Sequence, residues 1–527
     1  MTYLRTIAIC ALSFCLAAES AGQAPVRDYR YALQSEGPWL QSGNAAALSS
    51  LGADSFSSAV LSFGKYDGGL VSTGGSDDCL DADLYTESYK RISDRLVFSG
   101  RLGYSYFSGK NMGGQILMEP LYNPVNFLEA DLSTAGGKVQ EDYSMSGGLS
   151  WSPSGRWAAG VQMDYTASDR TKHKDPRFRN VWMDLRVSPG AAFALSDDFR
   201  LGTNLIYRRT IEQLTARLFG TVDREYSILV DQGSFYGTQE RFEGDIGYVS
   251  ATNDRTMIND FAGLSFQMGT ASFYNQLTAL WRSGYYGKRS SSSVVFCEFS
   301  GPEAEYSAEL RIRRADRTHI VRADAGWKRL SNYTNSYSYT VEEGMNAQVV
   351  YHGSNLSLLR NDLSLAASYV LNAEEGGFLP GWVAEAHADG FVRSQTTTAY
   401  PSYREQYYFN AGISLRLERN MKLGKGCLTL GGGALFRIGG GTPASDGSSA
   451  SGTSKMKSFD EYLYTQFEYD TAPRAGAGLY AAYTWLHLGK AAPYIRISDD
   501  FLSLARAPEH LSGAWRNAAV ACVGVNF

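Results

Sequence analysis

Long stretches of the chain alternate between apolar and polar residues with a period of two. In the first of them, Leu96, Phe98, Leu102 and Tyr104 alternate with polar residues such as Arg101. A period of two places the apolar side chains on one face of a β-strand and the polar ones on the other. The alternation is clearest in six segments: 96–106, 139–151, 157–165, 304–312, 403–416 and 475–485. The pattern therefore predicts an all-β chain.

The connections between these segments favour a barrel over a soluble sandwich. Short polar turns are expected at 93–95, 152–155, 196–198, 269–270 and 315–317, and long connections at 109–137, 213–257, 286–302 and 439–457. Many apolar faces also carry Tyr or Trp near their ends, as the aromatic girdles of membrane barrels do. We predict a transmembrane antiparallel β-barrel of about 18 strands, with 14 to 16 as alternatives, short periplasmic turns and long extracellular loops. Within it, Met345–Tyr351 and Leu356–Leu371 form either one strand or two.

Composition and charge agree with this fold class. The chain has 34 Tyr, 25 Phe and 55 Gly but only 14 Pro, which would interrupt strand ladders. The mean hydropathy is −0.26 and no segment has the length of a membrane-spanning helix. The net charge is −5 without a basic run, which excludes a nucleic-acid partner.

Both ends of the sequence indicate an outer-membrane protein. Residues 1–22 have a positive start, a short apolar core and small residues at their end, as in a signal peptide. A lipoprotein signal ending at Cys15 is the alternative. At the other end, Val523, Val525 and Phe527 share one face of the last strand. A terminal aromatic on such a face resembles the signal that outer-membrane barrels present to the barrel-assembly machinery, so outer-membrane lipid and this machinery are expected partners.

Two further resemblances concern the family. Gln23 soon after the cleavage site and Phe527 at the end resemble the large outer-membrane barrels of Bacteroidota, a Gram-negative group. The segment Asn44–Leu48 is similar to the Asn-Pro-Ala segment near the start of fatty-acid-transporter-like barrels, although the Pro is missing. We therefore expect residues 23–54 to form a short segment that can enter the lumen as a hatch, followed by the barrel over residues 55–527.

Many charged residues are expected on the lumen face of the strands. They form either a polar path for a solute or charge pairs that fill the lumen. These lumen-lining candidates are Arg101, Arg156, Asp164, Asp184, Arg186, Arg200, Arg208, Arg322, Asp324, Glu385, His387, Arg404 and Arg416.

Other motifs have simpler interpretations. The acidic stretch 77–83 could hold a hard cation, but a solvated loop is the simpler reading. Cys79 and Cys297 lie in expected loops, where they could pair. His352 and Ser354 have the spacing of an outer-membrane lipid hydrolase, but His510 and Ser512 repeat it, which argues for chance. We predict no metal, no cofactor and no enzymatic activity.

The sequence thus favours a passive or accessory channel for a small or hydrophobic solute. One alternative is a barrel that does not transport but partners a surface lipoprotein or another transporter through its long loops. The lipid hydrolase is the third possibility.

Overall fold

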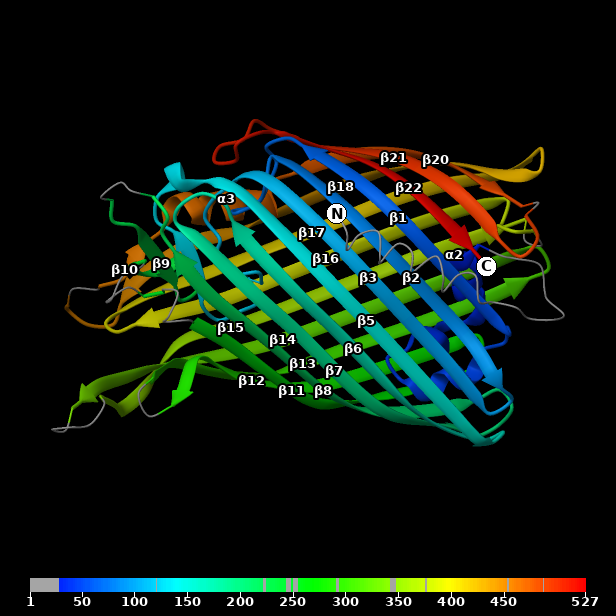
Figure 1. The fold of residues 1–527 in the computed structure, drawn as a ribbon, viewed down its shortest axis with the longest axis horizontal. Coiled ribbons are helices and arrows are strands. Elements are labelled where there is room, and N and C mark those ends of the chain that lie inside the picture. The colour runs from blue at the N-terminus through cyan, green and yellow to red at the C-terminus, as the bar shows by residue number, and fades with distance from the viewer. Residues whose placement is uncertain are drawn as a thin grey trace.

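The chain forms one closed antiparallel barrel of 18 strands, as the alternation predicts. The computed structural model describes residues 28–527 except 120, 221–223, 243–247, 250–254, 291–292, 342–346, 375–376, 453–454 and 487. Neighbouring strands follow one another along the chain, and β1 closes the barrel by pairing with β22 (Figure 1). The expected signal peptide lies outside the described residues.

The wall consists of strands of 12 to 26 residues. Their bounds are β1 Ser55–Asp67, β2 Asp78–Ser93, β3 Leu96–Met112, β5 Gly136–Ser154, β6 Trp157–Lys172, β7 Arg177–Ala194, β8 Arg200–Arg217, β11 Arg255–Gly269, β12 Phe273–Ser290, β13 Ser293–Arg314, β14 Arg317–Thr340, β15 Gln348–Ala373, β16 Trp382–Ala399, β17 Ser402–Leu423, β18 Gly426–Ser448, β20 Arg474–Trp485, β21 Ala492–Leu504 and β22 Trp515–Asn526.

The alternation of the sequence becomes the two sides of this wall. Leu102, Leu205 and Trp281 are large apolar side chains that are more than half exposed, because they point away from the barrel. Such an apolar outer surface is what a membrane-spanning barrel presents to lipid. At the seam, Val523 lies on the outer face, and the backbone of Phe527 exchanges hydrogen bonds of 2.7 and 3.0 Å with Ser57.

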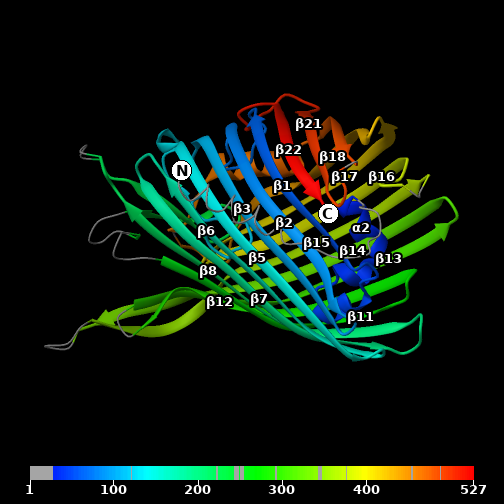
Figure 2. The ribbon, with the colours of Figure 1, turned by 45° about the vertical axis from the view of Figure 1, so that its right-hand side comes forward.

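The two ends of the barrel differ in their connections. At one end, here called the turn end, neighbouring strands are joined mostly by tight turns, and β1 begins and β22 ends there (Figure 2). At the other end, the loop end, the longest connections leave the wall. Each of the five expected short turns overlaps an observed turn or lies within two residues of it. The observed turns at residues 94–95 and 315–316 are examples.

Several expected loops are strands instead. Residues 286–302 lie almost entirely on β12 and β13, and β18 extends to Ser448, so two long connections are shorter than the sequence suggests. The acidic stretch 77–83 lies mostly on β2, where its side chains alternate between the two faces. The two segments 345–351 and 356–371 belong largely to one strand, β15, with a bulge near Gly353. Polar and glycine-rich runs look like loops in sequence, but pairing to a neighbouring strand keeps them extended.

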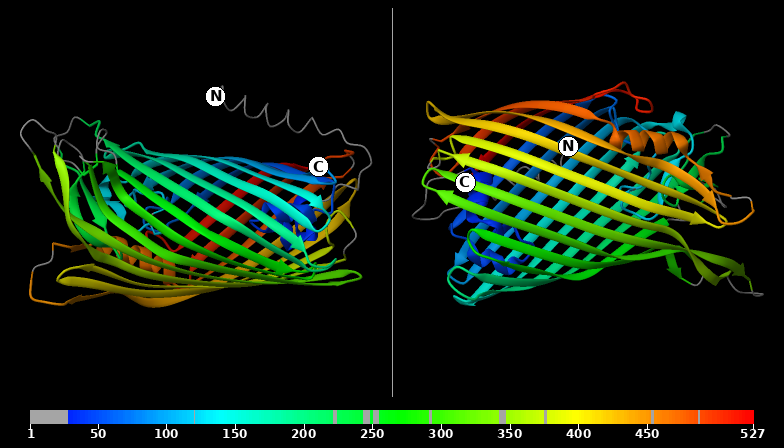
Figure 3. Two further views of the ribbon diagram at one scale, coloured as in Figure 1. Left: turned by 90° about the horizontal axis from the view of Figure 1, so that it is seen from below. Right: turned by 180° about the vertical axis from the view of Figure 1, so that it is seen from behind.

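Residues 28–53, here called the N-terminal segment, precede the wall and lie inside the barrel at the turn end (Figure 3). The segment consists of helix α2 (Tyr29–Glu36) and the short 3-10 helices η1 (Pro38–Gln41) and η2 (Ala45–Ser50). Asp28 caps α2 by accepting a hydrogen bond from the Tyr31 amide. Helix η2 packs against the inner side of β3, β5, β6 and β7.

Three long connections fold together at the loop end. They contribute a small sheet in the order β19-β10-β9-β4, separate from the wall, and helix α3. These elements and the described residues that connect them are here called the loop-end plug. Their bounds are β4 Asn126–Glu129, η3 Leu132–Thr134, β9 Ser227–Asp231, β10 Tyr236–Arg241, β19 Lys457–Ser458 and α3 Asp460–Thr471. In the described part of the chain, no helix combines the length and apolar character needed to cross a membrane.

Candidate functional site

The middle of the lumen is lined by charged side chains that stay partly exposed. Arg208 pairs with Asp184 at 2.8 Å, and the two side chains are 28% and 22% exposed. Arg437 and Asp389 pair at 2.6 Å with similar exposure, and Arg101 is half exposed. Inward-facing side chains can be exposed only where the interior is open to solvent, so side chains do not fill this part of the barrel.

Most of the lumen-lining candidates lie on strands and face other polar groups. Besides Asp184, Arg208 and Arg404, five have ionisable partners within 3.8 Å. These pairs are Arg101–Glu87, Arg322–Glu309, Glu385–Arg30, His387–Asp389 and Arg416–Glu418. Arg404, a further candidate, pairs with Asp446 at 2.6 Å where β17 meets the loop-end plug.

The remaining candidates are dispersed. Asp164 accepts hydrogen bonds from Ser146 and Gln162, and Arg186 approaches Ser188. Arg200 lines a cavity at the turn end, and Asp324 is exposed on β14. The assignment of Arg156 to the lumen is wrong, because this residue lies in the turn between β5 and β6. Arg156 directly precedes β6, so in the sequence it looks like one more polar position of that strand.

Asn44 fastens the N-terminal segment to the wall. Its side-chain oxygen accepts a hydrogen bond of 3.1 Å from the Ala46 amide and so caps η2. Its amide nitrogen lies 3.1 to 3.2 Å from oxygen atoms of Ala191, Thr203 and Gln267. Asn44 is 1% exposed, so one buried side chain both starts the helix and joins it to three strands.

Glycines in the wall make this close contact possible. Gly160 and Gly190 lie on neighbouring strands beneath η2. A Cβ atom at Gly160 would fall closer than 3.0 Å to the Ala46 nitrogen, and one at Gly190 equally close to the Asn44 side chain. A Cβ atom at Gly202 would lie 3.1 Å from the side-chain nitrogen of Asn44. The N-terminal segment is therefore seated on a glycine floor where the two backbones meet.

A cavity of about 1070 Å³ opens beside the N-terminal segment at the turn end. It is lined by residues of α2 and η1 on one side and by the wall on the other. Arg311, which is 3% exposed, and Arg313 donate hydrogen bonds from the wall to the backbone oxygens of Gln34 and Ser35. The segment therefore narrows the turn end and leaves this cavity beside it.

Buried arginines of the wall hold the loop-end plug. Arg360 donates to the backbone oxygens of Leu121 and Tyr122 at 3.0 and 2.7 Å. Arg282 donates to the same Tyr122 oxygen at 3.1 Å and lies 4.1 Å from the centre of its ring. These arginines are 6% and 3% exposed, and charge-assisted hydrogen bonds in such surroundings are strong.

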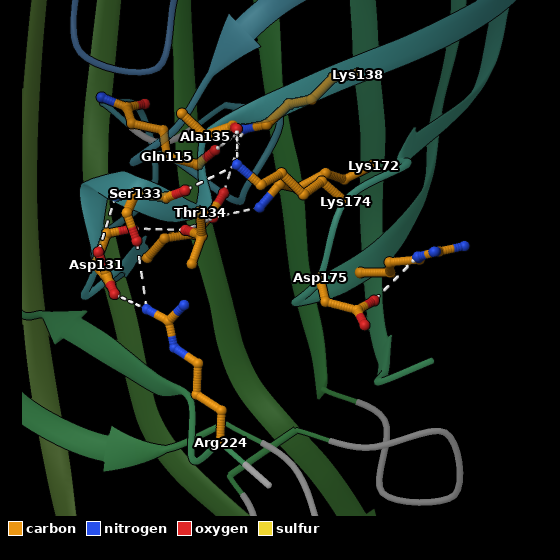
Figure 4. A network of polar contacts seen from close by, with 12 residues as sticks. Gln115, Asp131, Ser133, Thr134, Ala135, Lys138, Lys172, Lys174, Asp175 and Arg224 are labelled. Atoms are coloured by element: carbon orange, nitrogen blue, oxygen red, sulfur yellow. Dashed lines mark hydrogen bonds and ion pairs between the residues drawn. The ribbon is translucent and has the colours of Figure 1, made fainter. Parts of the chain in front are cut away.

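A second buried network joins β4 to the wall (Figure 4). Glu129 forms an ion pair with Lys172 and lies 3.9 Å from Lys138. Lys138 also donates to the Gln115 backbone oxygen at 2.7 Å, and Thr134 donates to Glu129 at 2.5 Å. The Glu129 and lysine side chains are at most 1% exposed, so this part of the plug carries charges that only the docked arrangement neutralises.

Asp231 is a buried carboxyl group at the tip of the plug. It accepts hydrogen bonds from the amides of Gly233 and Tyr236 at 2.8 and 3.1 Å. Burial raises the pKa of Asp231 to about 6, although these amides and the guanidinium groups of Arg360 and Arg404 oppose the shift. The docked plug therefore favours the protonated form of this carboxyl.

The motifs considered for other chemistry have other contacts. His352 hydrogen bonds with Ser338 at 2.8 Å, on an exposed part of β15. His510 stacks on Tyr464 in a loop. Cys79 and Cys297 are free and buried, on β2 and β13 and not in loops.

The residues that attach the two inner segments are mostly absent from the sequence-based candidates. Arg282 and Arg360 lie at polar positions of segments that also carry alternating apolar residues. The sequence therefore indicates that their side chains point inward. Their contacts join residues more than 150 positions apart, which no local pattern indicates. Arg404, which donates to Ser234, Phe235 and Ser458 of the plug, and Asn44, whose segment is singled out by similarity, are the exceptions, yet their anchoring roles follow only from the structure.

Comparison with known proteins identifies a family but no activity. The profile of a family described as "Family of unknown function (DUF6850)" matches residues 45–527. This range begins with η2 and includes the whole wall. No curated protein matches the chain in sequence.

Solved structures with a related arrangement are distant. The ferric yersiniabactin uptake receptor FyuA from Yersinia pestis has 9% identity and a TM-score of 0.39, over 89% of this chain and 80% of that one. The outer membrane transporter YddB from Escherichia coli has 8% identity and a TM-score of 0.38 over the same shares. A Pseudomonas aeruginosa FadL homologue has 11% identity and a TM-score of 0.29, over 93% of each chain. At these scores the likeness assigns neither a cargo nor a mechanism.

Proposed function

The chain belongs to a family of unknown function, DUF6850, and we propose from its structure that it is a gated channel for a small polar solute in a bacterial outer membrane. The turn end faces the periplasm and the loop end faces the outside in this proposal. The supporting observation is that segments contributing no strand to the wall occupy both mouths of a solvent-lined barrel.

The arrangement allows each mouth to open without breaking the wall. The N-terminal segment precedes β1, so it can leave the lumen while all barrel pairings remain. The small sheet of the loop-end plug pairs only within itself, and its order contains no wall strand. Both segments are therefore attached to the barrel and are not part of its closure.

The lining favours a polar solute over a hydrophobic one. The pairs Arg208–Asp184 and Arg437–Asp389 present both signs of charge and remain partly exposed. An apolar molecule that passes such groups displaces their water and offers no hydrogen bonds in return, whereas a polar molecule can exchange hydrogen bonds with them. No catalytic step is part of the proposal.

Solute uptake into liposomes tests this function. Liposomes would contain the refolded mature chain, a variant lacking residues 23–53, a variant with residues 219–253 replaced by a short Gly-Ser turn, or the double variant. We expect small sugars and amino acids to enter fastest through the double variant. Uptake that equals protein-free liposomes for all four proteins, each with a confirmed barrel circular dichroism spectrum, would contradict the channel.

A second function is favoured by a specific feature of β14 and β15. Residues 348–357 of β15 pair with β14 but not with β16, whose pairing starts at Leu358. Tyr337, Tyr339 and Tyr351 are exposed on this protruding ribbon. A free strand edge beside exposed tyrosines suits a protein partner, such as a surface lipoprotein or another transporter. Stoichiometric co-purification of a protein that is lost when the ribbon is shortened would support this role.

A further inference from the structure

A small cavity lies where the loop-end plug meets β15, β16 and β17. Its volume is about 30 Å³, which suits roughly two water-sized occupants. Asp231, Ser234 and Gln466 line it from the plug, and Gln395 and Arg360 line it from the wall. The cavity is therefore formed only when the plug is docked.

Buried polar atoms without a hydrogen-bond partner surround this cavity. Each belongs to a residue that is at most 6% exposed, and such atoms are rare in folded proteins unless a bound molecule or ion satisfies them. The five atoms on lining residues are Asn123 Oδ1, Asn126 Nδ2, Ser234 Oγ, Gln395 Oε1 and Gln466 Oε1. Most of these atoms are oxygens, so the occupant must mainly satisfy acceptors.

Neighbouring hydrogen bonds fix the direction of two of the amides. Gln395 donates its amide nitrogen to Gln406 at 2.6 Å, and Gln406 donates to the Pro443 oxygen at 3.0 Å. Gln466 donates its amide nitrogen to Asp470 at 3.1 Å. Because the nitrogens are engaged, Oε1 of Gln395 and Oε1 of Gln466 are the atoms left over.

Charged side chains of both signs line the cavity. Arg360 and Arg393 are the two cations, and Asp231 and Asp470 are the two carboxylates. Arg393 is paired with a third carboxylate, Asp362, through bonds of 2.7 and 2.8 Å, whereas Arg360 donates to backbone oxygens. Arg474 acts on Asp470 only from outside the lining, and in the described part of the chain neither lining carboxylate has an ion-pair partner.

The backbone of the tip agrees with an incomplete site. Ser234 and Phe235 have φ angles of 56° and 52°, a region that side chains other than glycine avoid. Strain of this kind persists where the surroundings hold the backbone, often at a functional site.

We propose that this cavity binds one monovalent cation of the size of sodium together with a water molecule, and that the cation fastens the loop-end plug to the wall. Oxygens of Gln395, Gln466 and Asp231 are suitable ligands for a hard cation. The water accepts the hydrogen bond of Asn126 Nδ2, because a cation would repel this donor group. Cation binding stands on the cavity alone, whereas its effect on gating rests on the proposed channel function.

Hydrogen exchange of the plug tests the cation site without any measurement of transport. The intact mature chain in detergent is compared at pH 7.5 in sodium chloride and in choline chloride of equal ionic strength. We expect the amides of Gly233 and Tyr236 to exchange about tenfold more slowly when sodium is at ten times its dissociation constant. Equal exchange in the two salts would overturn the proposal and leave water as the only occupant.

Two variants and one control locate the effect. Asp231→Asn removes the charge and Gln466→Met removes one oxygen, while both keep side chains of similar size, so each should abolish the difference between the salts. The control is Asp164→Asn, another lumen carboxyl, which is hydrogen bonded to Ser146 and Gln162 on the wall and should keep the full difference. A sodium effect that survives in both cavity variants would also overturn the site.

The result separates the two proposals. A sodium effect on exchange without any solute uptake would retain the site and refute the gated channel. Uptake that is the same in sodium and choline, with equal exchange, would retain the channel and refute the site.

Discussion

The N-terminal segment and the loop-end plug occupy opposite mouths of one barrel, yet they are held by different physical means. The segment rests mainly on Gly160 and Gly190 through small residues and the buried amide of Asn44, although Arg311 and Arg313 also donate to its backbone oxygens. The plug depends on charged groups such as Arg360, whose bonds end on its backbone oxygens.

The difference implies different sensitivities. A contact built on close packing depends on side-chain volume and hardly on salt or pH. A contact built on buried charges depends on protonation and on ions. The glycine-floor contact would thus respond mainly to side-chain volume, whereas the plug contact would respond to its ionic surroundings.

The largest effect is expected from filling the glycine floor. Gly190→Val places a side chain where Asn44 lies, and overpacking of this kind costs about 1–3 kcal/mol, or roughly 5- to 150-fold in the docked population. The readout is the maleimide labelling rate of a cysteine at Ala46, which is fully buried, in a chain whose four mature cysteines are serine. Labelling should accelerate by that factor.

A matched substitution controls this experiment. Gly147 lies on β5, and an added Cβ there would meet nothing within 4 Å. Gly147→Val should therefore leave the labelling rate unchanged. If Gly147→Val and Gly190→Val accelerate labelling equally, the glycine floor does not hold the segment.

Asn44→Ala should release the same segment more mildly. The substitution removes the cap of η2 and the bonds to the wall, and loss of a cap alone costs about 0.5–2 kcal/mol. Labelling at position 46 should rise by roughly 2- to 30-fold on that account. Replacing Ser49, whose hydroxyl donates only to the Ala46 oxygen within the segment, should have a smaller effect.

Arg360→Gln should loosen the plug and leave the segment in place. Its bonds to Leu121 and Tyr122 are lost, and an unsatisfied buried carbonyl costs about 1–3 kcal/mol. Exchange of the Tyr236 amide should accelerate while labelling at position 46 stays constant. Arg289→Gln, at an exposed ion pair of β12, is the control that should change neither rate.

The smallest effect is the pH dependence of the plug. Because the docked plug raises the pKa of Asp231 from 3.8 to about 6, it binds the proton more tightly than the free plug does. In choline chloride, docking should therefore be strongest below about pH 4 and weaken between pH 4 and 6 as the carboxyl ionises. Exchange at Tyr236, corrected for its intrinsic rate, should show this loss in the native chain and not in Asp231→Asn. A native profile that coincides with that of Asp231→Asn would refute the assignment.

The sequence predicts the wall well because its strands report their two environments locally. The alternation around Leu102 and Trp281 reflects lipid on one side of the strand and the lumen on the other. It can be recognised without knowing which strands are neighbours. Errors concentrate where a polar or glycine-rich run is extended by pairing, as in residues 286–302 and 439–448.

The inner segments are much harder to predict. Arg360 and Leu121 are 239 positions apart, and Asn44 meets Gln267 across 223. Their contacts arise from how three loops and the start of the chain fold into a closed barrel. Local periodicity contains no information on such encounters, so lumen-facing charges are readable from the sequence but their partners are not.

The most direct test of the central claim is the single-channel conductance of four refolded proteins in a planar bilayer: the mature chain, the variant without residues 23–53, the variant with residues 219–253 replaced, and the double variant. We expect the lowest current for the mature chain, intermittent current for each single variant and a steady large current for the double variant. A double variant that inserts as a barrel and conducts no current would contradict a lumen gated at both ends.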